Sequence, residues 1–257
     1  MAPDAVDPDE PDEPDEPYEP ADENEALDDL LQIVRRHVAG GSPLDILGLA
    51  SATLSMILHP DPPVTVDREL VRDKVIEDVV LRYVDVGTSD SLTYATALAG
   101  LVANDTLRTR LRAALDGSES EIPPWLARLD DAQLERTTVV RDLFDDDEWL
   151  LAGVRLVGDS RFAFRVEIDH NADSAVSNAS LMPTTADAVL DQLRGAASSD
   201  EVAIIEVTPT DFWARYTEAV AVADHADETV RSETWPSCRP LVEWALRQAP
   251  TDRRVAS

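Results

Sequence analysis

The sequence predicts an α+β fold, in which an N-terminal helical bundle is followed by an antiparallel meander of four to five strands packed with C-terminal helices. Three observations support this fold class. In the first half, apolar residues recur at spacings of three and four. From about residue 133 they alternate in steps of two. The connections between the alternating segments are short and rich in turn residues, which is typical of antiparallel hairpins.

The first two helices form the predicted centre of the bundle. Leu27, Leu30, Leu31, Val34 and Val38 give an amphipathic helix that Gly40-Gly41 ends. Ser42-Pro43 then starts a helix over about 43–58, because a capping oxygen precedes a proline at the first helical position. That helix is apolar around most of its circumference, so we expect other helices to surround it.

Three further helical segments complete the bundle. After a proline-rich break at 59–63, a helix is expected over about 67–84. Its predicted inward residues are Leu70, Val71, Val75, Ile76, Val79 and Val80. The next helix is capped by Ser89 or Asp90, is interrupted at Asn104-Asp105 and resumes to Leu115. Pro123-Pro124-Trp125 predicts a short linking helix.

Alternation predicts the strands of the second half. Phe162, Phe164, Val166 and Ile168 alternate with smaller or polar residues, which indicates a strand with one buried face. The expected strands are Thr137–Phe144, Trp149–Val157, 162–168, Ser174–Met182 and Val202–Val207. Helices are expected at 185–196, Pro209–His225 and Trp235–Gln248.

These elements predict four parts of the chain: an acidic tail at 1–23, a helical bundle at 24–130, a sheet with helices at 131–250, and a short tail at 251–257. The first 30 residues hold fourteen Asp and Glu and no Lys or Arg, and Pro-Asp-Glu repeats three times from Pro8 to Glu16. Prolines lack a backbone donor, like charges repel, and little is apolar, so the acidic tail is expected to be disordered. The tail at 251–257 is also expected to be disordered.

Net charge narrows the class of partner. Subtracting the fourteen acids from the net charge of −30 leaves −16 on the remaining residues. Nucleic acid and anionic membranes would repel such a chain, so neither is an expected partner. Another protein, possibly a basic one, fits better. One cysteine, no signal peptide and no long apolar run predict a cytoplasmic protein.

Two sequence blocks resemble a family of conserved actinobacterial proteins. They are Ile168-Asp169-His170-Asn171, at the end of a strand, and the block from Trp235 to Trp244, which begins Trp-Pro-Ser-Cys-Arg-Pro. The resemblance covers about residues 40–250. It implies the same architecture, a helical N-terminal part followed by this hairpin and a last helix, and it implies no activity.

An acidic sheet edge is the candidate metal site. Alternate turns of a meander lie at the same end of a sheet, so the turn at 145–148 should lie near the turn at 169–173. The candidate ligands are Asp145, Asp147, Asp169, His170 and Asp173. Carboxylates and an imidazole suit a divalent cation such as Mn, Zn or Fe. The alternative is that Asp and Asn are there because they favour turns.

Aromatic residues near the C-terminus are the candidate interaction site. They are Phe212 and Trp213 on one predicted helix, and Trp235 and Trp244 with Arg239 on the last. Arg239 could stack on a tryptophan or hold a carboxylate. The alternatives are that these aromatic residues are core and that Cys238 is a buried filler rather than a nucleophile, since no histidine is spaced to activate it.

No motif specifies a reaction or a cofactor, because the chain has no glycine-rich phosphate loop, no nucleophile elbow and no His-Glu-x-x-His. The leading hypothesis is therefore a non-enzymatic protein-interaction module: an adaptor, a regulator or a chaperone-like protein. The first alternative is a metal-dependent enzyme that uses the acidic edge. The second is a DNA-mimic inhibitor, which would need regularly spaced acids on one face.

Overall fold

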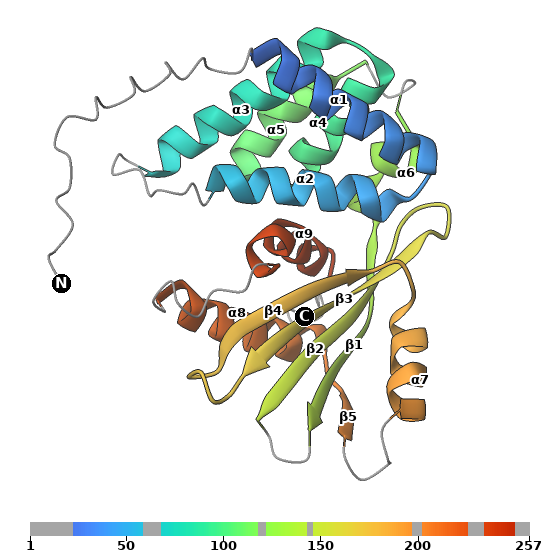
Figure 1. The fold of residues 1–257 in the computed structure, drawn as a ribbon, viewed down its shortest axis with the longest axis vertical. Coiled ribbons are helices and arrows are strands. Elements are labelled where there is room, and N and C mark those ends of the chain that lie inside the picture. Colours follow the sequence, from blue (N-terminus) through green and yellow to red (C-terminus); the bar gives the residue numbers. More distant parts are fainter. Residues whose placement is uncertain are drawn as a thin grey trace, which may run out of the picture.

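The computed structural model of the chain is an α+β fold, as predicted (Figure 1). It describes residues 23–58, 68–117, 122–142, 146–196, 202–225 and 234–249. Apart from Glu23, the predicted disordered tails lie outside the described residues, and so does the predicted proline-rich break at 59–63.

The helical bundle follows the predicted periodicity. Its helices are α1 (Glu23–Gly40), α2 (Pro43–Leu58), α3 (Arg68–Val86), α4 (Ser89–Leu101), α5 (Asp105–Leu115) and α6 (Pro124–Ala127), followed by a 3₁₀ turn, η2 (Leu129–Asp131). Helix α2 spans the predicted range and buries residues around most of its circumference. Asn104 ends the expected interruption by capping α5, because its side-chain oxygen accepts the backbone N–H groups of Thr106 and Leu107. None of the described helices is long and apolar enough to cross a membrane.

The cap of α4 lies one residue before the predicted one. Thr88 is the N-cap: its Oγ1 accepts the N–H of Ser91 at 3.2 Å, and the Oγ of Ser91 accepts the N–H of Thr88 at 3.0 Å. The prediction of Ser89 or Asp90 was wrong because a threonine with a polar residue three positions later forms a reciprocal capping box.

The predicted inward face of α3 was wrong for three of its six residues. Ile76 and Val80 are buried and Val79 is half-buried, as expected. Leu70, Val71 and Val75 are exposed by 75%, 43% and 41%. The helix carries apolar residues on two sides, and α4 and α5 cover the side of Ile76, Val80 and Tyr83. We call Leu70, Val71 and Val75 the α3 patch.

The sheet has five antiparallel strands in the order β4-β3-β2-β1-β5. The strands are β1 (Gln133–Asp142), β2 (Asp147–Arg155), β3 (Arg161–Asp169), β4 (Ala175–Met182) and β5 (Val202–Glu206). The first four form the predicted meander. Helix α7 (Ala186–Ala196) then crosses to the opposite edge, where β5 pairs with β1.

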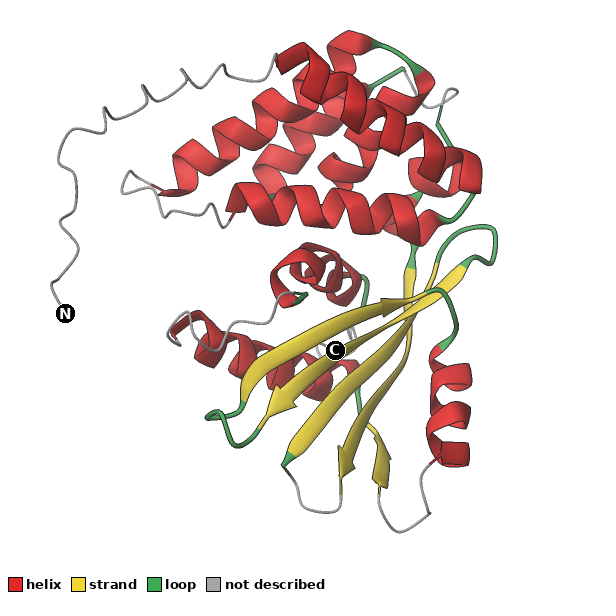
Figure 2. Cartoon of the chain, viewed as in Figure 1, coloured by secondary structure: helices red, strands yellow, loops and turns green. Residues whose placement is uncertain are grey.

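Helices cover both faces of the sheet (Figure 2). Phe162, Phe164, Val166 and Ile168 are buried on one face, as the alternation predicted, against α8 (Pro209–His225) and α9 (Trp235–Arg247). The other face packs against α7. Its buried cluster consists of Val140, Leu151, Ala163, Ala186, Val189 and Leu190.

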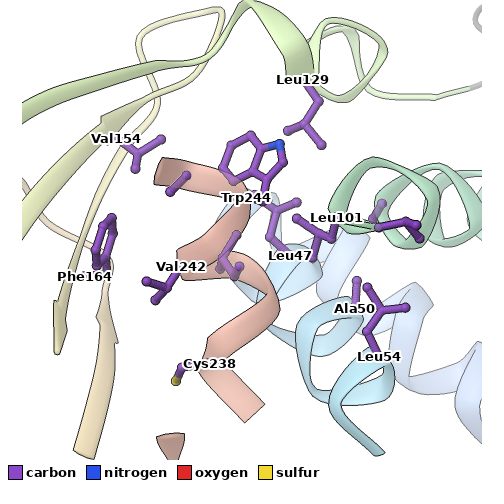
Figure 3. Packing of buried hydrophobic residues seen from close by; sticks show 14 of the residues in the cluster. Leu47, Ala50, Leu54, Leu101, Leu129, Val154, Phe164, Cys238, Val242 and Trp244 are labelled. Carbon is purple, nitrogen blue, oxygen red and sulfur yellow. The ribbon is translucent and has the colours of Figure 1, made fainter. Parts of the chain in front are cut away.

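Helix α9 lies between the bundle and the sheet (Figure 1). Figure 3 shows Val242 and Cys238 on the side of Phe164, and Leu47, Ala50 and Leu54 of α2 on the other side of the helix. Val242 and Trp244 are at most 1% exposed. One continuous apolar cluster therefore runs from the bundle through α9 to the sheet and joins the two predicted halves.

A serine of α2 completes the backbone hydrogen bonding of α9. The Ser51 hydroxyl donates to the carbonyl oxygen of Ser237 at 2.7 Å and accepts the N–H of Leu241 at 3.1 Å. In a regular helix Leu241 would donate directly to Ser237. Pro240 lies inside α9, where a proline disturbs the helical ladder, and the hydroxyl of Ser51 hydrogen-bonds to the backbone on both sides of it.

Ser51→Ala should lower the free energy of unfolding by about 1–3 kcal/mol, because it removes the hydroxyl that hydrogen-bonds to the N–H of Leu241 and to the carbonyl oxygen of Ser237. Chemical denaturation followed by circular dichroism measures this loss. Ser237→Ala is the matched control: it keeps the carbonyl that Ser51 uses and should change stability by less than about 0.5 kcal/mol. Equal stability of wild type and Ser51→Ala would contradict the bridging role.

Candidate functional site

The structure brings the two acidic turns together at one end of the sheet. Asp147 is opposite Asp169 in the register of β2 and β3, and the N–H of His170 donates to the carbonyl oxygen of Asp146 at 2.9 Å. Asp173 is exposed in the turn that follows β3 and has a φ of 56°. Asp145, the fifth candidate ligand, lies outside the described residues.

Like charges crowd Asp147. Partial burial and repulsion from Asp169, Asp142, Glu167 and Asp146 raise the pKa of Asp147 above its ordinary value. Among the residues that the structure describes, no three His, Cys, Asp or Glu side chains are placed to hold a metal ion. Because Asp145 is not part of that set, metal binding at this edge stays a prediction.

Glu148 is the feature of this edge that the residue pattern alone did not single out. It is 1% exposed and is the one charged residue that is buried within the described ranges. It pairs with Ile168 across β2 and β3, so it lies on the face that packs against α8 and α9. The signal was present in the sequence, because Glu148 is in step with Leu150, Ala152 and Val154.

Three elements supply partners to the Glu148 carboxylate. Arg141 of β1 donates through Nε at 2.7 Å, and Arg215 of α8 donates to both carboxylate oxygens at 3.2 Å. The Nε2 of His170 lies 3.9 Å away, and its Nδ1 is 2.9 Å from the Oγ of Ser174. The arginines engage both carboxylate oxygens. Glu148 is therefore arranged as an anchor that fastens α8 to the sheet, not as a general base.

Most of the aromatic candidates lie in the core. Phe212, Trp235 and Trp244 are at most 6% exposed, whereas Trp213 is 41% exposed. The ring of Tyr216 joins two of them, with centroids 5.8 Å from Trp213 and 5.9 Å from Trp235. Within this candidate set, Trp213 is the aromatic residue that a partner could touch without rearrangement.

Trp235, Cys238 and Arg239 of the Trp-Pro-Ser-Cys-Arg-Pro block make structural contacts. Arg239 makes a bidentate pair with Asp224 of α8 at 2.6 and 3.1 Å, donates to Glu243 at 2.8 Å and lies 5.9 Å from the Trp235 ring. Burial lowers its pKa, but the hydrogen bonds to the two carboxylates outweigh this and raise it overall. The Cys238 Sγ contacts the carbonyl oxygen of Ala179 in β4 at 3.8 Å. Burial raises the pKa of this thiol, which disfavours the reactive thiolate.

A polar hollow of about 610 Å³ lies between η2 and the turn that joins β2 to β3. Its arginines already have partners inside the protein: Arg128 pairs with Asp131 at 2.7 Å, and Arg155 pairs with Glu135 at 2.9 Å. Asp130 is held by Arg112. The hollow therefore offers few free charges to a ligand.

No family model matches this chain, and no curated protein or solved structure is similar to it. The resemblance to the actinobacterial family accordingly stays an expectation.

Glu148→Gln should lower the free energy of unfolding by about 1–3 kcal/mol, because it replaces one carboxylate oxygen by an NH2 donor and removes the negative charge that pairs with two guanidinium groups. Urea denaturation at neutral pH measures the loss. Asp130→Asn removes the acid of the exposed pair with Arg112 and should cost less than about 1 kcal/mol. If both variants lose the same amount, Glu148 does not anchor α8.

Asp147→Asn should raise the free energy of unfolding at neutral pH by less than about 1 kcal/mol, since the exposed side chain is screened by solvent. The raised pKa means that the fold favours the protonated carboxyl, so ionisation costs stability as the pH rises through that pKa. The gain should vanish below the ordinary pKa, where the side chain is protonated in both states.

Urea denaturation at neutral and acidic pH tests this dependence. Asp173→Asn, in the neighbouring turn, controls for the loss of one negative charge from a chain of net charge −30. A gain that is the same at both pH values, or that Asp173→Asn reproduces, would show that crowding at Asp147 is not its cause.

Proposed function

We propose that this chain is a non-enzymatic protein-interaction module that binds a basic protein partner in the cytoplasm. The observation that carries the proposal is the α3 patch, whose apolar side chains face solvent, whereas most other apolar residues of the described bundle are buried or half-buried. Apolar patches of this kind mark sites where proteins associate. Met56, near the C-terminal end of α2, is also exposed, by 68%.

Charge supports a basic partner. The net charge of −30 and the fourteen acids in the first 30 residues would attract a cationic protein over long range. Salt screens such attraction within about 8 Å at physiological ionic strength, so the acids would speed association while the patch holds the complex.

The DNA-mimic alternative has less support, because α5 carries Arg108, Arg110 and Arg112 and a single acid, Asp105. A metal-dependent enzyme would have to use the acidic turns, where the described residues offer the crowded Asp147 and the fully engaged Glu148. Neither alternative explains why the α3 patch is left exposed.

Replacing Val71 and Val75 together by Asp should reduce recovery of the partner at least tenfold, because two charges would enter the apolar contact. The measurement is affinity capture from the native cytosol, in which the same protein must be retained by wild type and lost from the variant. Chemical denaturation confirms that the variant is folded.

Val86→Asp is the control: it places one aspartate, where the test variant places two, on the same helix at a position that is 36% exposed and outside the patch. It should capture the partner as well as wild type does. Equal recovery by all three proteins would overturn the proposal. So would size-exclusion measurements in which the double variant dissociates a dimer of this chain and no other protein is bound.

A further inference from the structure

The two edges of the sheet differ in how they are covered. At the β4 edge, the N–H of Ala179 lies 3.5 Å from the Oγ1 of Thr234, and the Ala179 carbonyl oxygen is contacted by the Sγ of Cys238. Both partners belong to the start of α9. The Trp-Pro-Ser-Cys-Arg-Pro block therefore blocks this edge against another strand.

The β5 edge has no such cover in the part of the chain that the structure describes. The N–H of Val207 donates to the carbonyl oxygen of Thr137 at 3.1 Å, so odd-numbered residues of this strand direct their backbone groups toward β1. In an antiparallel strand, the N–H and C=O groups of successive residues point to opposite sides of the strand. Those of Val202, Ile204 and Glu206 therefore point away from β1, where the sheet order places no further described strand.

Three of the five β5 side chains are exposed, and Val202 and Ile204 are half-buried against the cluster on the α7 face. Ala203 and Glu206 are exposed, and Ile205 is 44% exposed. Asp142, opposite Val202 in the register, and Asp211, in the first turn of α8, have no described cation within ion-pair distance.

The arginines nearby are already engaged by carboxylates. Arg136 is held by Asp187 and Glu206, and Arg141 by Glu148. A strand that arrives at this edge with lysines or arginines thus finds acids that have no cation.

We infer that β5 is the strand to which an extended segment of the partner adds, and that this segment alternates basic and apolar residues. The inference rests on the proposed function and names the recognition mode: backbone hydrogen bonds to Val202, Ile204 and Glu206 give affinity, and the acids give charge selection. A second copy of this chain fits less well, because pairing β5 with β5 brings two acidic edges together. The proline-rich acidic tail fits less well too, because proline lacks the N–H that strand pairing needs.

Amide hydrogen exchange by NMR tests the inference on the full chain. The probe is a blocked peptide of alternating lysine and valine, and the matched control peptide alternates glutamate and valine. The lysine peptide should slow exchange at the amides of Val202, Ile204 and Glu206 and leave Ala203 and Ile205 unchanged, because these two already donate to β1. The glutamate peptide should bind at least tenfold more weakly.

Ile204→Pro removes an outward N–H without removing a donor to β1, and it should weaken binding of the lysine peptide at least tenfold. The exchange pattern in wild type tests strand addition at β5 even if this variant fails to fold. No binding at millimolar peptide, protection elsewhere in the chain, or a β5-mediated dimer without peptide would each overturn the inference.

The same variants separate this inference from the proposed function. If Ile204→Pro captures the partner like wild type while the α3-patch variant does not, strand addition at β5 is wrong and the interaction module stands. If neither variant loses the partner, both proposals fail.

Discussion

The buried hydroxyl of Ser51 holds together two parts of the chain that are almost two hundred residues apart. It lies where Pro240 disturbs α9, and it hydrogen-bonds to a carbonyl oxygen and an N–H of that turn. Helix α9 can therefore pack against α2 on one side and the sheet on the other with its backbone satisfied. Without that helix, the apolar residues that α2 and the sheet turn toward it would be exposed.

Local patterns predicted the elements well, because each pattern has a local physical cause. Gly40 and Gly41 mark the C-terminal end of α1. Pro43 and Pro209 mark the starts of α2 and α8. Alternation from Phe162 to Ile168 predicted both β3 and its buried face. The buried side of α3 was harder to predict, because apolar residues occupy two sides of this helix. Its packing against α4 and α5 determines which side is buried. A single sequence does not say which side a neighbour will cover.

In the candidate site too, features with a local cause were predictable and features that depend on tertiary packing were not. Meander topology predicted that the two acidic turns meet, and they do. The buried glutamate could have been found from its step with Leu150, but its partner Arg215 lies 67 residues further along on a separate helix. No spacing rule connects the two. The tryptophans near the C-terminus are buried by tertiary packing and not by any local signal, so composition alone suggested an interaction surface where the fold has a core.

Helix α9 follows the bundle and the meander in the sequence, and this order has a consequence for biosynthesis. The bundle and the meander leave the ribosome before the helix that fills the space between them. Until α9 follows, the apolar residues of α2 and the sheet that pack against it lack that cover, and chaperones or premature aggregation would act on them. A nonsense codon shortly before Trp235 would thus leave a product unable to close its core.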